Sequence, residues 1–107
     1  MIVKNGCITD DALASLKNYS DLIECECPNH LMAILDEVRK FQAYTTECIT
    51  KYPKDASTHR WLQSAATNVD VLLSNTIVQL ARMEGFIGSD NNFVSRNELK
   101  PKDESLS

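Results

Sequence analysis

The fold is decided by residues 28–52, which read PNHLMAILDEVRKFQAYTTECITKY. Pro28 suits the first turn of a helix, because its missing N–H would have no intrahelical partner and its fixed φ is helical. Pro53 stops the helix, since the proline ring clashes with the preceding turn. Between them, apolar and small side chains recur at alternating spacings of three and four, which predicts one long helix over residues 28–52 with a single seam. The seam consists of Leu31, Ile34, Val38, Phe41, Thr45, Cys48 and Tyr52.

A second long helix is predicted over residues 56–84, with Asp55 as its cap and Gly85 as its left-handed end. The connection is so short that the two helices should be antiparallel neighbours. Upstream, residues 9–19 are expected to form a short helix capped by Thr9 or Asp10, and residues 22–27 an extended stretch. The second long helix has a seam of Leu62, Ala66, Val69, Leu73, Thr76, Leu80 and Met83, and beside it a second stripe of Trp61, Ala65, Leu72 and Ile77.

The fold class expected is therefore all-α: a long antiparallel helical hairpin plus a short N-terminal helix. The apolar face is wider than one antiparallel partner covers, so we expect a second copy to cover the excess and complete a four-helix bundle homodimer. Residues 1–87 would form this helical domain, and the polar residues 88–107 a disordered tail. The residues expected in the core or dimer seam are Leu31, Ile34, Val38, Phe41, Leu62, Val69, Leu72, Leu73, Ile77 and Leu80.

Length, charge and composition limit the domain organisation, the partners and the location that can be expected. At 107 residues the chain is expected to form one small domain without a second, catalytic one, and its net charge of -4 with scattered Lys and Arg argues against direct binding to nucleic acid. No apolar run approaches the roughly 18 residues that span a membrane. The first residues have no signal-peptide pattern, so a cytoplasmic location with reduced cysteines is expected.

Three motifs carry a family resemblance: CECPNHL at residues 25–31, FQAYTTEC at 41–48, and Asp55-Ala56 followed by His59. Residues 8–87 resemble the C-terminal region of a group of bacterial MerR-type transcriptional regulators. The resemblance implies an effector or dimerisation domain, and a regulator carrying the same domain as a further partner. The winged helix-turn-helix of such regulators is lacking, so DNA reading is not implied, and the D-x-H-x-x-G motif of their cobalamin-binding relatives is absent.

Two thiols and an imidazole lie within six residues, at Cys25, Cys27 and His30. Zinc takes four such ligands, and Cys7 would be the fourth if the extended stretch after the first helix brought the chain back toward it. Alternatively, Cys25 and Cys27 sense redox state, because a thiolate at a helix N-terminus has a lowered pKa. A third interpretation makes them small packed side chains at a helix start. Zinc is thus one interpretation, and no other cofactor is expected.

A second polar cluster, Glu47, Cys48 and His59, should gather at the other end of the hairpin. It resembles a nucleophilic Cys-His pair, but Cys48 also occupies a seam position and no third orienting group is identifiable. Glycine-rich phosphate loops and metalloprotease motifs are absent, so no enzyme is expected. The functions left open are a dimerisation or regulatory module, a zinc or thiol sensor, and a small-molecule binder in the bundle core.

Overall fold

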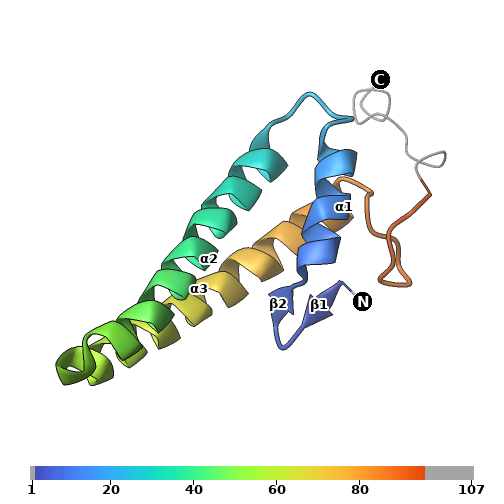
Figure 1. The fold of residues 1–107 in the computed structure, drawn as a ribbon. Coiled ribbons are helices and arrows are strands. Elements are labelled where there is room, and N and C mark those ends of the chain that lie inside the picture. The colour runs from blue at the N-terminus through green and yellow to red at the C-terminus, as the bar shows by residue number, and fades with distance from the viewer. Residues whose placement is uncertain (1, 96–107) are drawn as a thin grey trace.

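The structure is a computed structural model that describes residues 2–95. It is mostly helical, with a long antiparallel helix pair crossed at one end by a shorter helix (Figure 1). The predicted helical hairpin and short N-terminal helix are confirmed, and a small two-stranded sheet is added to them. In chain order the elements are β1 (Val3–Lys4), β2 (Cys7–Ile8), α1 (Asp10–Ser20), α2 (Cys27–Lys51), a 3-10 turn η1 (Pro53–Asp55) and α3 (Ala56–Met83).

The long pair is set by its helix ends. Pro28 lies in the first turn of α2, and Pro53 opens the 3-10 turn that reverses the chain. Asp55 lies at the cap position of α3, but its side chain makes no capping hydrogen bond. Gly85 has a φ of +82°, which closes α3 with the left-handed residue that glycine provides without a Cβ clash. Helices of 25 and 28 residues give an elongated molecule of 60 × 25 × 17 Å.

The small sheet is a β-hairpin that precedes α1. Val3 pairs with Ile8 and Lys4 with Cys7 in antiparallel register. The two turn residues, Asn5 and Gly6, have φ values of 55° and 81°. Positive φ at both central residues is typical of a type I′ turn, for which Asn-Gly is the favoured sequence. The hairpin was not predicted, although Asn5-Gly6 is its signal in the sequence.

The connection from α1 to α2 differs from the expected extended stretch. Thr9 caps α1 by accepting a hydrogen bond from the Ala12 N–H at 3.2 Å, as predicted. After Ser20 the chain turns at once, with the Leu22 N–H bonded to the Tyr19 carbonyl. Helix α2 then begins at Cys27, so the chain returns along α1 as a helix and not as a strand.

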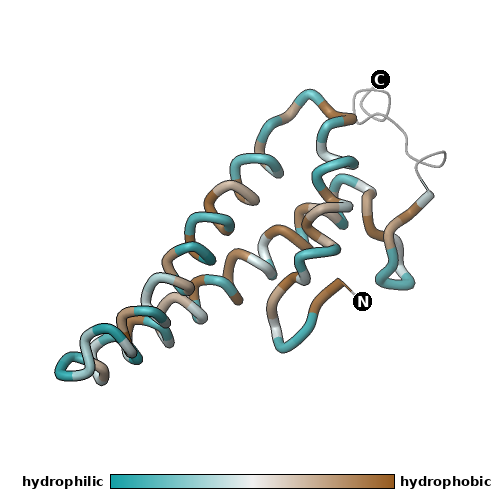
Figure 2. The backbone as a smooth tube through the Cα atoms, in the orientation of Figure 1, coloured by the Kyte–Doolittle hydropathy of each residue, from teal (hydrophilic) through white to brown (hydrophobic). Residues whose placement is uncertain are grey.

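The hydrophobic core lies at one end of the hairpin, where α1 crosses it (Figure 1). Beyond the reach of α1, only Thr45, Cys48 and Ala66 are buried in the two long helices as they approach the turn. In Figure 2 this distal end is largely teal. The distal half of the hairpin is therefore two helices with little core of their own. The core consists of Ile8, Ala12, Leu13, Leu16, Tyr19, Met32, Leu35, Ile77, Ala81, Phe86 and Ile87.

The segment after α3 continues the fold to residue 95, so the tail expected to be disordered from residue 88 does not begin there. Phe93 stacks on Tyr19 with ring centroids 5.2 Å apart. The Val94 N–H bonds to the Phe86 carbonyl at 3.0 Å, and the Tyr19 hydroxyl donates to the Val94 carbonyl. The segment is polar overall, but its two apolar residues, Phe93 and Val94, pack against the core. The rest of the predicted tail, residues 96–107, lies outside the described residues.

Candidate functional site

Near α1, the face that the hairpin buries is shifted by one residue from the predicted seam. There α2 buries Met32 and Leu35 where the prediction had Leu31 and Ile34, whereas Thr45 and Cys48 near the turn are seam residues that are buried. One residue along a helix is a rotation of about 100°, so the shifted part of the predicted seam lies on the side of the hairpin. On α3, Ala66 is a buried seam residue, but Asp70, Ser74, Ile77 and Ala81 are buried where the seam had Val69, Leu73, Thr76 and Leu80.

The shift leaves predicted seam residues on the surface. Ile34, Phe41, Val69 and Leu72 are 51%, 43%, 44% and 66% exposed. Leu31, Val38, Leu62, Leu73 and Leu80 are half-buried, and Ile77 is buried. The aromatic side chains of Tyr44 and Trp61 also lie on the surface, at 60% and 68% exposed.

Part of this surface forms a groove of about 380 Å³ between α2 and α3, which we call the groove face. Ala65 and Ala66 provide small side chains between larger apolar ones, and Glu37 is its one charged lining residue. Exposed apolar patches of this kind mark interaction sites more often than isolated exposed residues do. The groove face is lined by Ile34, Glu37, Val38, Phe41, Leu62, Ala65, Ala66 and Val69.

Helix α3 presents no charge beside the groove face. From Trp61 to Ala81 its only charged residue is Asp70, which is 3% exposed. The exposed residues of this stretch are therefore uncharged, and they include Trp61, Val69 and Leu72. Depletion of charge together with enrichment in aromatic residues is typical of the buried centre of a protein interface.

Asp70 explains why polar residues occupy the buried face. Its carboxylate accepts from Arg39 Nε at 3.0 Å and Nη2 at 3.2 Å, from Gln42 Nε2 at 3.1 Å and from Ser74 Oγ at 2.9 Å. The Cys7 thiol also donates to it. We call these five residues the Asp70 cluster. Arg39 lies between apolar seam positions, where a charged side chain is expected to face solvent, yet its side chain is only 21% exposed. The available signal was the lone acid in the uncharged stretch of α3.

The Asp70 cluster fixes the charge states of its members. Burial would raise the pKa of Asp70, but hydrogen bonds from Arg39, Ser74, Gln42 and Cys7 outweigh it and lower that pKa below its ordinary value. The pKa of the Cys7 thiol is raised by burial and then by its hydrogen bond to the Asp70 carboxylate. The cluster thus holds an ionised carboxylate and a protonated thiol.

The same cluster attaches the β-hairpin to the long helices. Arg39 Nη2 donates to the Ile8 carbonyl at 2.7 Å, and the Ile8 N–H donates to Ser74 Oγ at 3.0 Å. Arg39 Nη1 also pairs with Asp10 at 3.0 Å. These contacts connect β2 and the start of α1 to both long helices, and they account for the position of β2.

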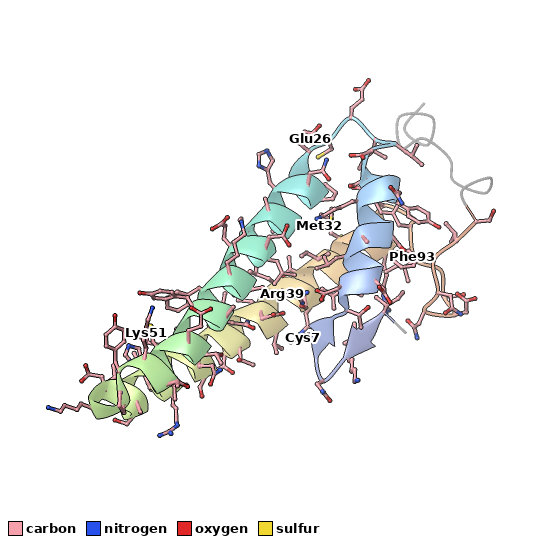
Figure 3. All side chains as sticks on the ribbon, viewed as in Figure 1. Cys7, Glu26, Met32, Arg39, Lys51 and Phe93 are labelled. Atoms are coloured by element: carbon pink, nitrogen blue, oxygen red, sulfur yellow. The ribbon has the colours of Figure 1, made fainter. Side chains whose placement is uncertain are left out.

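The four predicted metal ligands do not come together. Cys7 lies on β2 close to Arg39, whereas Glu26, between Cys25 and Cys27, lies beyond the opposite end of α1 (Figure 3). The 11 residues of α1 separate the two places by about 16 Å. The prediction of Cys7 as fourth ligand was wrong, because residues 21–26 stay at the C-terminal end of α1 and do not run back along it to Cys7. Cys25, Cys27 and His30 are exposed, and residues 2–95 contain no group of three or more His, Cys, Asp or Glu side chains that could hold a metal ion. The four cysteines form no disulfide.

The second polar cluster has its members in different surroundings. Cys48 is buried at 4% exposure, His59 is half-buried and Glu47 is exposed. The His59 Nδ1 atom is buried without a hydrogen-bond partner, and its ring lies 6.3 Å from that of Tyr52. Cys48 is bonded instead to the Tyr44 hydroxyl, a contact that is the main cause of the raised pKa of Tyr44. Cys48 is therefore a buried residue of α2 whose thiol bonds to a side chain of the same helix.

No helix within residues 2–95 is long and apolar enough to cross a membrane. Comparison of the chain with protein families, with curated proteins and with solved structures finds no match.

Proposed function

We propose that this chain is a helical association module that acts by pairing with a second copy through the groove face. The observation that carries the proposal is the uncharged outer surface of α3 beside the groove, on which the apolar side chains of Leu72 and Trp61 are 66% and 68% exposed. Burying large apolar side chains of this kind stabilises an association by roughly 1.5–3 kcal/mol each.

The position of the core supports the same conclusion. Helix α1 covers only one end of the hairpin, so no other segment of residues 2–95 encloses the distal halves of α2 and α3. Two helices bury only one side of each, whereas four enclose a core. A second hairpin packed on the groove face would supply the two missing helices and give the four-helix dimer expected from sequence.

The proposed association has a regulatory role if the resemblance to MerR-type regulators extends to function. The second copy could then be replaced by the same domain of a transcription regulator, which would present an equivalent groove face. Mixing the chain with the C-terminal region of such a regulator and measuring hetero-association by light scattering tests this. Exclusive self-association in the mixture would remove the regulator as partner.

The experiment for the pairing itself compares three apolar-to-acid substitutions. Phe41→Asp and Leu72→Asp change exposed residues of the paired surface, and Leu22→Asp changes a residue of similar exposure, 48%, in the connection between α1 and α2. We expect the wild-type chain and Leu22→Asp to sediment as dimers at micromolar concentration. Phe41→Asp and Leu72→Asp should sediment as folded monomers, because both side chains are exposed within one chain. A monomeric wild-type chain would refute the proposal.

A small apolar ligand is a second candidate occupant, favoured by the groove volume of about 380 Å³. Ligand sites in proteins span about 300–1,000 Å³ and are lined mostly by apolar side chains with few polar groups. Screening apolar compounds by melting temperature tests this candidate. A compound that raises the melting temperature of the wild-type chain and not of Phe41→Asp would support it.

A further inference from the structure

Resting on the proposed function, we infer that the two copies pair antiparallel along α2, with Glu37 of each copy facing Lys51 of the other. Glu37 lines the groove, and Lys51 is the last residue of α2 at the distal end of the hairpin (Figure 3). Tyr44 lies midway between them and would meet its own counterpart on the two-fold axis.

The spacing of these residues carries the inference. Residues seven apart occupy the same heptad position and follow one stripe along a helix that packs against another. Glu37 and Lys51 each lie seven residues from Tyr44, so an antiparallel copy centred on Tyr44 brings opposite charges together twice. A parallel copy would instead place Glu37 against Glu37 and Lys51 against Lys51. Charges flanking a helical interface set the orientation of partners in this way.

Glu37, Tyr44 and Lys51 are exposed enough in one chain to contact a second copy. Among residues 2–95, Glu37 forms an ion pair only with Lys40, at 3.2 Å, and the two side chains are 75% and 73% exposed. Tyr44 is 60% exposed and Lys51 is exposed. The Gln63 side chain bonds to Thr46 across the hairpin at 2.6 Å, so Tyr44 lies about level with Ala65, whose small side chain permits close approach.

The antiparallel arrangement also places the contact between the copies at the end of the hairpin away from the core. A two-fold axis at Tyr44 pairs residues 37–51 of α2 with the same residues of the second copy. Most of this stretch lies in the distal part of the hairpin, beyond the ion pair of Arg39 with Asp10 at the start of α1. Each copy would thus cover the part of the other that lacks a core.

The inference is tested by exchanging charges and measuring the dimer dissociation constant by sedimentation equilibrium at low salt. Glu37→Lys and Lys51→Glu should each weaken the dimer about tenfold, because each puts two like-charge pairs in place of two opposite ones. The double variant E37K/K51E restores both pairs in reverse and should return the constant to within about threefold of wild type. Glu24→Lys and Lys4→Glu make the same charge changes at exposed residues away from α2 and should leave the constant within about threefold.

The outcomes separate this inference from the proposed function. A wild-type dimer with weakened single variants and a restored double variant supports the antiparallel pairing. A wild-type dimer whose double variant is weakened as much as the single variants together overturns the pairing and leaves the groove-face dimer intact. A wild-type monomer overturns the proposed function and the antiparallel pairing together.

Discussion

Arg39 and Asp70 join the two long helices through a pair of hydrogen bonds, Nε to Oδ2 at 3.0 Å and Nη2 to Oδ1 at 3.2 Å. The carboxylate is 5% exposed and the guanidinium 21%. Removing one partner of a buried pair leaves the other uncompensated, so Asp70→Ala should lower the free energy of unfolding by about 3–5 kcal/mol in urea denaturation. Asp36→Ala is the matched control. Its pair with Lys17 is about half exposed, so its loss should cost less than about 1 kcal/mol. Equal effects of the two changes would contradict the structural role given to Asp70.

The lowered pKa of Asp70 predicts how stability depends on pH. A carboxyl group whose pKa is lower in the folded than in the unfolded chain stabilises the fold above the unfolded pKa of about 3.9. That contribution is lost as the pH falls through the folded-state pKa. The difference in free energy of unfolding between the wild-type chain and Asp70→Asn should therefore be constant above about pH 5 and shrink below it. Chemical denaturation from pH 7 to pH 3 measures this, and a difference that grows with acidity would disprove the assignment.

The four thiols should react at different rates with iodoacetamide. Cys25 and Cys27 are exposed and should be alkylated first. Cys7 is half-buried with a raised pKa, so little of it is the reactive thiolate, and Cys48 is buried. Timed alkylation followed by peptide mass spectrometry gives the order. In denaturant all four should react alike, and a native Cys7 faster than Cys25 would show that its bond to Asp70 does not form.

Replacing Cys25 and Cys27 by serine tests the remaining sensor hypothesis. Both side chains are exposed, so the double variant should keep the wild-type melting temperature to within about 2 °C. We expect the bound zinc of the purified chain, measured by elemental analysis, to be the same before and after the change. A loss of zinc or of a response to oxidant in the double variant would establish the sensor.

Phe93 should stabilise the fold although it follows the predicted end of the domain. Its ring stacks on that of Tyr19 at an interplanar angle of 17°. Phe93→Ala should therefore lower the free energy of unfolding by about 1–3 kcal/mol, less than for a fully buried phenylalanine because Phe93 is only half-buried. Ser89→Ala, an exposed change in the same segment, should be neutral. A neutral Phe93→Ala would support a disordered segment after residue 87.

The helices were predictable because their signals are local. Pro28, Pro53 and Gly85 act on the backbone next to them, so they mark helix ends whatever the rest of the chain does. The Asn5-Gly6 turn is equally local, and its omission was a failure to use an available signal.

The rotation of the seam was not predictable from apolar spacing alone. Arg39 and Asp70 lie 31 residues apart, and each is costly to bury without the other. A pattern that counts only apolar residues therefore assigns both to the surface and shifts the seam onto Ile34, Phe41 and Val69. The distance between Cys7 and Cys25 was equally unpredictable from ligand spacing. It is set by the path of residues 21–26, which keeps Cys25 and Cys27 at the end of α1 opposite Cys7.

The placement of the core at one end gives the hairpin two ends of unequal stability. Amides near α1 lie in a core built from five segments (β2, α1, α2, α3 and the residues after α3), whereas those near Pro53 are packed mainly against the opposite helix. Segments with few buried contacts open at lower free energy than the molecule as a whole. Amide hydrogen exchange should thus be graded along α2 and α3, fastest at the turn. A partner that binds the distal half would be expected to slow exchange there most, because that half has the fewest buried contacts in the free chain.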